Sequence, residues 1–192
     1  MQPLMEHALK TTWLLVGLYW LWSSRRRKAT SYTESFFKRF VAYYLPLLLA
    51  GALLGPGKWY GDFWLHQRFL PEIVLLEPVG LAMVMGGAFF ACLARYTLGR
   101  NWSLAAQLKH EHEVVQSGPY RFVRHPIYSG LLLAFMGTAV MIGEWRALVA
   151  FAIIFCSFLY KFRVEERLLR VHFGDGYLQY HARTKALIPE IY

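Results

Sequence analysis

The sequence has few charged residues, and this shortage already excludes common classes of protein. Charged residues make up 17% of the 192 residues, whereas hydrophobic residues make up 56%. A typical soluble domain carries about a quarter of charged residues, so neither an ordinary soluble domain nor a disordered chain is expected. The formal net charge is nevertheless +9. This combination indicates a membrane protein whose positive charge is concentrated in particular segments.

Cysteines and nucleotide-binding motifs are also scarce. The two cysteines, Cys92 and Cys156, lie in apolar segments and form no CxxC pair, so no disulfide framework and no zinc or redox motif is expected. The sequence has no GxGxxG and no GxxxxGK[ST] motif, which are the phosphate-binding loops of nucleotide-binding domains. Any cofactor must therefore be held by helix ends and short loops against the membrane.

Five apolar segments each predict a membrane-spanning helix. They are residues 9–24, 36–55, 73–94, 126–143 and 145–160. The last two are separated only by a short turn, so they must form an antiparallel helical hairpin. We predict an all-α, polytopic membrane fold in one domain, residues 1–192. Three spans lie in residues 9–94, and residues 95–192 contain spans four and five, a cytoplasmic loop and C-terminal helices.

The basic residues predict how these helices are oriented. Residues 24–39 hold six Lys and Arg, residues 95–127 hold five and residues 161–192 hold six, against four elsewhere. Because cytoplasmic loops carry the excess of Lys and Arg, we expect the N-terminus outside and the C-terminus in the cytoplasm. The host membrane would be a prokaryotic cytoplasmic membrane or the endoplasmic reticulum. Membrane lipids are the expected partners, and the charge requires no nucleic acid.

Small residues predict close contacts between helices. The spacing of the histidines does not predict a metal site. Gly51 and Gly55 form a GxxxG pair, and Gly130, Ala134 and Gly137 form a stripe in the fourth span; both patterns are typical of closely packed membrane helices. Five of the seven histidines lie in the two C-terminal cytoplasmic segments, but without repeated HxxxH spacing. We therefore predict no metal site.

Chemistry-bearing residues cluster just before the fourth span, in residues 118–130. Arg124 and His125 directly precede Pro126, which is well suited to the first turn of a helix. The free N–H groups and positive end of such a helix favour a carboxylate or another anion. A basic patch that holds anionic lipid headgroups is an equally good interpretation.

A second cluster follows the fifth span. It contains Lys161, Arg163, Glu165 and Glu166. On a helix, Glu165 and Glu166 point about 100° apart, so they cannot serve one site equally. A carboxylate here would pair with a cationic ligand, or simply with Arg163 or Arg170 along the helix. Gly174 then predicts a helix stop before an amphipathic stretch.

In order along the chain, these clusters resemble the isoprenylcysteine carboxyl methyltransferase and phospholipid methyltransferase superfamily of integral membrane enzymes. The similarity covers about residues 100–192 and is specific to the superfamily rather than to one substrate. The matching residues are His112, Val115, Gly118, Tyr120, Arg124, His125, Pro126, Tyr128, Glu165, Glu166, Phe173, Gly174, Tyr177, Tyr180, Ile188 and Pro189.

The resemblance implies S-adenosyl-L-methionine as the cofactor. It assigns cofactor binding to Gln107, His112, Glu113, Val114, Val115, Tyr120, His125, Pro126, Ile127, Tyr128 and Glu165. Lys161 occupies a position where prenylcysteine enzymes carry an arginine, and with Arg163 it is the substrate-binding candidate. Arg124 and Arg163 could hold an anionic substrate, and His125 or Glu166 could act as a base. These four are the candidate catalytic residues.

The implied function is methyl transfer to a lipid or lipidated acceptor at the cytoplasmic face, for example the carboxylate of a prenylated cysteine. Two alternatives remain open. The first is a membrane sterol- or enone-type reductase that uses a nicotinamide cofactor. Such reductases are generally longer than this chain, with more spans. The second is a non-catalytic membrane protein with the same fold.

Overall fold

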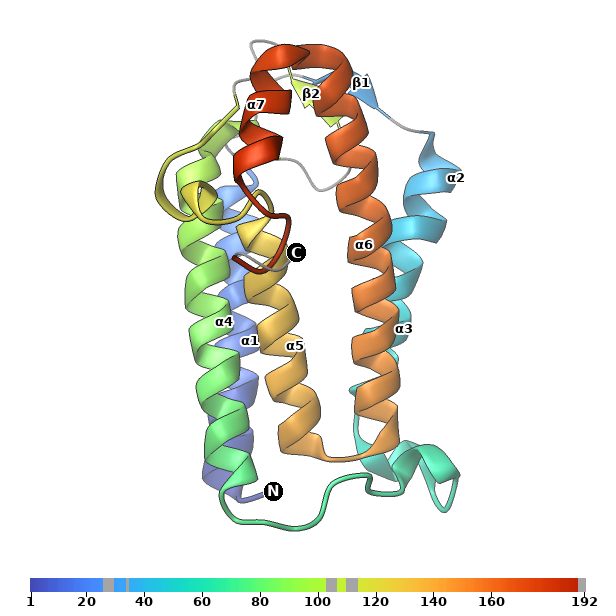
Figure 1. Cartoon of the computed structure of the whole chain (residues 1–192). Helices are drawn as coiled ribbons and strands as arrows, with labels where there is room; N and C mark the ends of the chain where they lie inside the picture. Colours follow the sequence, from blue (N-terminus) through green and yellow to red (C-terminus); the bar gives the residue numbers. More distant parts are fainter. Residues whose placement is uncertain (26–29, 34, 103–106, 110–113, 190–192) are drawn as a thin grey trace.

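The computed structural model describes residues 1–25, 30–33, 35–102, 107–109 and 114–189. Long helices run side by side, and a smaller cap of short elements covers one end of them (Figure 1). The helices are α1 Pro3–Ser23, α2 Phe36–Arg39, α3 Leu45–Leu53, α4 Leu76–Leu98, α5 Pro126–Ile142, α6 Trp145–Phe173 and α7 Asp175–Arg183. Short 3₁₀ turns are Gly57–Tyr60, Trp64–His66, Gly99–Asn101 and Gly118–Arg121.

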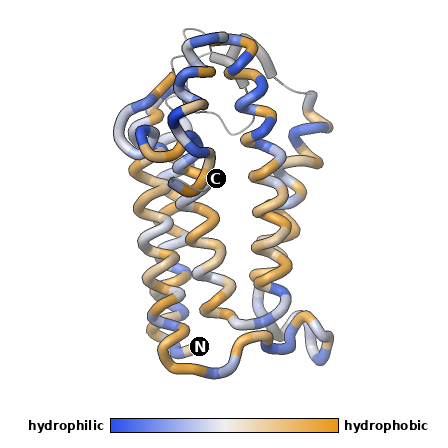
Figure 2. The backbone as a smooth tube through the Cα atoms, in the orientation of Figure 1, coloured by the Kyte–Doolittle hydropathy of each residue, from blue (hydrophilic) through white to orange (hydrophobic). Residues whose placement is uncertain are grey.

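The predicted helical architecture is confirmed, with one addition. Three helical stretches among the described residues, Phe36–Leu53, Leu76–Asn101 and Trp145–Phe173, are long and apolar enough to cross a membrane. Figure 2 shows hydrophobic residues along the helices and hydrophilic ones at both ends. Two short strands that the sequence analysis did not predict, β1 Thr30–Thr33 and β2 Gln107–Lys109, pair antiparallel in the cap. Strands this short give almost no periodic signal.

The helical stretch Phe36–Leu53 changes its winding before Pro46. Residues Phe40–Tyr44 form a π-helix between α2 and α3. Proline has no N–H to bind the carbonyl four residues earlier, which here is the carbonyl of Ala42. The Ser157 hydroxyl of α6 donates to that oxygen at 2.7 Å. This bond gives the Ala42 carbonyl a donor within an apolar segment, and it ties the π-helix to α6.

Helices α4 and α5 pack backbone against backbone along the predicted stripe of small residues. A Cβ atom on Gly130 would lie 2.6 Å from both Ala91 N and Gly87 O, and one on Gly137 would lie 2.8 Å from Val84 N. The packing role of this stripe is confirmed. The same prediction for Gly51 and Gly55 is wrong: nothing among the described atoms lies within 4 Å of a Cβ at Gly51, and Gly55 meets Trp59 and its own helix.

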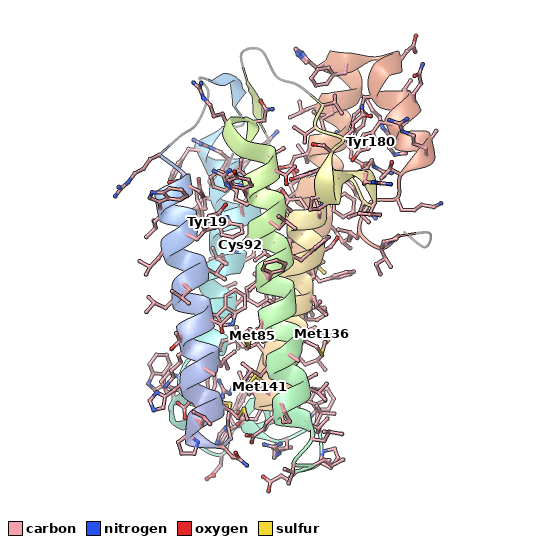
Figure 3. The ribbon with its side chains drawn as sticks, turned by 90° about the vertical axis from the view of Figure 1, so that its left-hand side faces the viewer. Tyr19, Met85, Cys92, Met136, Met141 and Tyr180 are labelled. Atoms are coloured by element: carbon pink, nitrogen blue, oxygen red, sulfur yellow. The ribbon has the colours of Figure 1, made fainter. Side chains whose placement is uncertain are left out.

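Helix α1 lies against α4 and α5. The Trp13 indole donates to Thr138 Oγ1 of α5 at 3.0 Å. The Tyr19 hydroxyl donates to the Cys92 carbonyl of α4 at 3.3 Å, and Figure 3 shows these two residues side by side. Near the opposite end of α1, Met141 of α5 is buried in a small apolar cluster with residues of α1 and α4.

The predicted hairpin of α5 and α6 is confirmed, and a preceding loop holds its turn. Gly143 ends α5 with φ +67°, a left-handed conformation that suits glycine. Its carbonyl accepts from the Phe69 N–H at 2.9 Å, and the Trp145 N–H donates to the Gln67 carbonyl at 3.1 Å. Helix α6 continues 13 residues beyond the end of the apolar segment at residue 160 and stops before Gly174 (φ +52°), so the helix stop predicted there is confirmed.

Candidate functional site

The candidate site forms where the loop before α5 meets the segment after α7. The N–H groups of Arg124 and His125 donate to the carbonyls of Lys185 and Ala186 at 2.8 and 2.9 Å. The Ser129 hydroxyl donates to the Leu187 carbonyl at 2.5 Å. The C-terminal segment therefore pairs with the loop like a strand, and it returns from the cap toward α5 in Figure 1.

The first group of site residues surrounds Glu165 on α6, and we call it the Glu165 cluster. It contains Glu165, Tyr128, His125 and Lys161. The Tyr128 hydroxyl donates to Glu165 Oε1 at 2.8 Å. His125 Nδ1 lies 3.9 Å from Glu165 Oε2, and Lys161 Nζ lies 4.0 Å from Oε1. The Glu165 side chain is 23% exposed, so this carboxylate retains access to a ligand.

Lys161 supplies the formal positive charge of the cluster. It is buried, and its Nζ lies 5.3 Å from the centre of the Tyr128 ring and 5.6 Å from that of Tyr43. Aromatic faces stabilise a desolvated cation, and Glu165 is the nearest carboxylate. The ammonium group is thus fixed at the junction of α5 and α6.

The second group centres on Glu166, and we call it the Glu166 network. Arg124 Nε donates to Glu166 Oε1 at 2.7 Å, and His125 Nε2 lies 3.1 Å from the same atom. Arg170 and His181 each approach Oε2 at 3.5 Å. Arg124 also donates to the carbonyls of His181 and Thr184. His125 contacts both carboxylates, so it joins the network to the Glu165 cluster.

The structure separates two residues that the sequence analysis grouped together. Lys161 and Arg163 are two positions apart on α6, about 200° around the helix axis. Lys161 is buried beside Glu165, whereas Arg163 is exposed and lines a cavity with Arg124, Glu166 and Arg170. Arg163 does not join the Glu165 cluster. Of the two predicted helical ion pairs, Glu166 pairs with Arg170 at 3.5 Å.

Two tyrosines connect α7 to the loop before α5. The Tyr180 hydroxyl of α7 donates to the Tyr120 carbonyl at 2.5 Å, and Tyr180 lies close to the loops of the cap in Figure 3. Burial raises the pKa of Tyr180 to about 12. Burial and the nearby Glu165 carboxylate raise the pKa of Tyr120 well above its usual range. Both hydroxyls therefore stay protonated and can donate hydrogen bonds.

The other predicted cofactor residues fall into two groups. Pro126 and Ile127 are buried in the first turn of α5, Val114 is half-buried, and Val115 packs against the main apolar core. His112 and Glu113 lie outside the described residues, and of Gln107 only the backbone, in β2, is described.

Sequence reasoning missed residues that act through their backbone or their aromatic ring. The carbonyls of Thr184, Lys185, Ala186 and Leu187 hold the Arg124–Ser129 segment. The Phe162 ring lies 5.0 Å from the His125 ring. Backbone acceptors leave no residue-type signal. The closing Ile188-Pro189 pair of the family pattern was the only indication that this segment reaches the site.

The chemistry of the donor set fits the cofactor that the sequence resemblance implied. S-adenosylmethionine carries a positively charged sulfonium and an ammonium group. The Glu165 cluster offers a partly exposed carboxylate beside the rings of Tyr128 and His125, which stack 5.6 Å apart. A carboxylate and aromatic faces both attract cations. Within the described part of the chain, no group of three His, Cys, Asp or Glu residues could hold a metal ion.

Comparison with known proteins finds similarity in the part of the chain that contains the site. A family profile described as phospholipid methyltransferase matches residues 76–176. A probable protein-S-isoprenylcysteine O-methyltransferase of Oryza sativa subsp. indica is 35% identical over 125 residues, which is 64% of this chain and 65% of the relative. The protein-S-isoprenylcysteine O-methyltransferase of Rattus norvegicus is 33% identical over 136 residues, 68% of this chain and 48% of the relative.

For another relative, the similarity covers a larger share of the relative's own length. Protein-S-isoprenylcysteine O-methyltransferase A of Arabidopsis thaliana is 34% identical over 134 residues, which is 64% of this chain and 68% of the relative. The similarity thus spans less than two thirds of the rice and rat relatives. The part that the family profile matches, residues 76–176, contains the α5–α6 hairpin and the Glu165 cluster.

Proposed function

The chain belongs to the phospholipid methyltransferase family, and from this premise we propose that it transfers a methyl group from S-adenosylmethionine to the carboxylate of a prenylated cysteine. The relatives named above are called protein-S-isoprenylcysteine O-methyltransferases. The observation that carries the proposal is the Glu165 cluster. In it, a partly exposed carboxylate and a buried ammonium group lie together between α5 and α6.

The proposed reaction needs positioning more than acid or base catalysis. When bound, S-adenosylmethionine supplies a methyl group on a positively charged sulfur. A carboxylate acceptor is already ionised, so no residue of this chain has to remove a proton from it. The contribution of the protein is to hold the acceptor oxygen in line with the methyl group. Lys161, in its aromatic surroundings, is the cation we assign to the acceptor carboxylate.

Glu165, Tyr128 and Tyr120 are the residues we assign to the cofactor, together with His112, Glu113, Val114, Val115 and Gln107 from the family pattern. Glu165 would pair with the positive charge of the cofactor. His125 lies between Glu165 and Glu166, and we assign it to positioning Glu165. Arg124 and Glu166 are already bonded to each other and to the C-terminal segment, so we assign them to holding the site together.

We also propose that the chain crosses the membrane five times, through α1, α2–α3, α4, α5 and α6. Helix α5 is apolar but has only 17 residues, so it would suit a thin or locally thinned bilayer. The proposed orientation puts the N-terminus outside and the Glu165 cluster at the cytoplasmic face. A lipid-anchored acceptor would then reach the cluster from the bilayer, and the water-soluble cofactor from the cytoplasm.

Cofactor binding is tested with purified protein in detergent. We expect S-adenosylmethionine to raise the melting temperature of the wild type, and Glu165→Gln to lose this shift. Glu72→Gln is the matched control, because Glu72 is 82% exposed in a loop at the opposite end. An unchanged shift in Glu165→Gln would overturn the assignment of Glu165. A shift with reduced nicotinamide dinucleotide but none with S-adenosylmethionine would favour the reductase alternative.

The acceptor is tested by transfer of labelled methyl groups. We expect N-acetyl-S-farnesylcysteine to be labelled, and its amide, which lacks the carboxylate, to remain unlabelled. Lys161→Met should raise KM for this acceptor while the cofactor-induced shift in melting temperature persists. Labelling of phosphatidylethanolamine in a total lipid extract, with none of the prenylcysteine, would contradict the proposed acceptor but leave methyl transfer in place.

A further inference from the structure

The cavity that Arg163 lines lies on the other side of α6 from Lys161. It has a volume of about 560 Å³ and is lined by α6, the loop before α5, and the end of α7 with the segment after it. Its apolar wall consists of Phe162, Ala182 and Ala186. The proposed methyl transfer assigns no role to Arg163, Arg170 or Lys185, which line this cavity.

The cavity is strongly cationic. Its lining includes Arg124, Arg163, Arg170 and Lys185, against one carboxylate, Glu166. Arg124 and Arg170 share that carboxylate. Arg163 and Lys185 are exposed, and no carboxylate of the described residues lies within ion-pair distance of either. Among the described residues, these two cations are therefore available to a bound anion.

The position of Arg163 along α6 indicates where that anion comes from. At a rise of about 1.5 Å per residue, Arg163 lies about 27 Å from Trp145 at the other end of α6. The hydrocarbon core of a bilayer is about 30 Å thick. Tyr160, half-exposed one turn earlier, is a residue type enriched at membrane interfaces. In the proposed orientation, the mouth of the cavity thus lies at the level of the cytoplasmic headgroups.

We propose that Arg163 and Lys185 bind the headgroup of an anionic phospholipid, with its phosphate between the two cations. This lipid is a resident of the site and is distinct from the methyl acceptor. Phosphate is a strong acceptor for Arg and Lys. A zwitterionic choline headgroup would bring a positive charge into a cavity that already holds four, so the site selects a net negative headgroup. By contacting α6 and Lys185 together, the lipid fastens the C-terminal segment that holds Arg124 and His125.

The test measures the melting temperature of the full-length chain in detergent, with added phosphatidylglycerol, phosphatidylcholine or inorganic phosphate. We expect phosphatidylglycerol to raise the melting temperature of the wild type, and the other two to leave it unchanged. The double variant Arg163→Ala/Lys185→Ala should lose the lipid-induced rise. Arg167→Ala is the matched control, because Arg167 is an exposed arginine of the same helix outside the cavity, and it should keep the rise.

The outcomes separate this proposal from its alternatives. An equal rise with phosphatidylcholine, or in the double variant, would overturn it, and so would an equal rise with inorganic phosphate, because the ligand would then be a soluble anion. Direct counting of bound phosphatidylglycerol by native mass spectrometry provides a second readout if the double variant is too unstable to melt cooperatively. Glu165→Gln should keep the lipid-induced rise, so failure of the cofactor proposal and failure of this one are distinguishable.

Discussion

His181 shows how a single side chain of the site depends on charge. It lies 3.5 Å from Glu166 Oε2 and 2.6 Å from Arg170 Nη2. Burial and the positive charge of Arg124 lower the pKa of His181, and the attraction of Glu166 only partly opposes them. The folded chain therefore favours the neutral imidazole more strongly than the unfolded chain does.

A pH dependence of stability follows from this shift. Because the pKa of His181 is lower in the folded chain than its unfolded value of about 6.5, the unfolded chain binds more protons in the window below that value. The contribution of His181 to stability is present above about 6.5 and is lost as the pH falls toward the folded-state pKa. We expect His181→Gln to show a smaller drop in melting temperature than the wild type between about pH 7 and pH 5.

The control for this effect is His172→Gln, because His172 is an exposed histidine at the end of α6. It should retain the full drop of the wild type. Equal drops in wild type and His181→Gln would show that His181 does not carry this part of the pH dependence.

At the level of single residues, the sequence predicts which side chains gather but not how they pair. Tyr128, His125, Lys161 and Glu165 were all named from the sequence, and the structure brings them together. The separation of Arg163 from Lys161 follows from their spacing on a helix, but which of the two faces Tyr128 depends on how α6 is rotated relative to α5. That rotation is fixed by contacts between residues far apart in the chain, which local patterns do not encode.

At the level of helices, the contact between α4 and α5 sets the geometry of the site, since α5 begins directly after His125. Gly87 and Gly130 let the two backbones touch. A Cβ atom on Gly87 would meet the Gly130 carbonyl and lie 2.7 Å from Ala134 N. Backbone atoms cannot rotate away as a side chain would, so the helices would have to move apart.

We therefore expect Gly87→Ala to destabilise the chain by about 1–3 kcal/mol or more, as overpacking usually does. The adjacent Gly86 is the matched control, because it is exposed and a Cβ there meets nothing within 4 Å among the described atoms. Gly86→Ala should be neutral or stabilising by up to about 1 kcal/mol, because alanine favours a helix. Melting temperatures in one detergent give the comparison, and equal losses in both variants would contradict this packing.

Helix positions were the most predictable part of the fold. Long apolar segments predict where α4 and α5 lie to within four residues, since a membrane helix must satisfy its own backbone. Helix α1 ends within one residue of its predicted end but begins six residues earlier than predicted. The β1–β2 pair was not predicted, whereas the helix stop at Gly174 was. Amphipathic and polar segments of the cap acquire their structure from each other, so their sequences alone indicate little.

For the molecule as a whole, charge and architecture are compatible with the proposed orientation. In Figure 1 the N-terminus, the loop between α3 and α4, and the α5–α6 turn lie at one end, and β1, β2 and α7 lie at the other. Seventeen of the 21 Lys and Arg residues belong to the three segments that the sequence analysis placed in the cytoplasm. A chain with these two ends meets the positive-inside rule with five crossings.

Accessibility of introduced cysteines tests this topology, after Cys92 and Cys156 are replaced by alanine. With a membrane-impermeant maleimide on intact cells, we expect labelling of Gln2→Cys and Asp62→Cys, because both would lie outside. Arg25→Cys and Asp175→Cys should react only in inverted vesicles, where the cytoplasmic face is exposed. The reason is that residues 2 and 62 share one end of the helices, and residues 25 and 175 share the other. If residues 2 and 25 are labelled from different sides, α1 must cross the membrane. Labelling of both ends of α1 from the same side would exclude five crossings, while Asp175→Cys labelled from outside would reverse the orientation and remove the cofactor site from the cytoplasm.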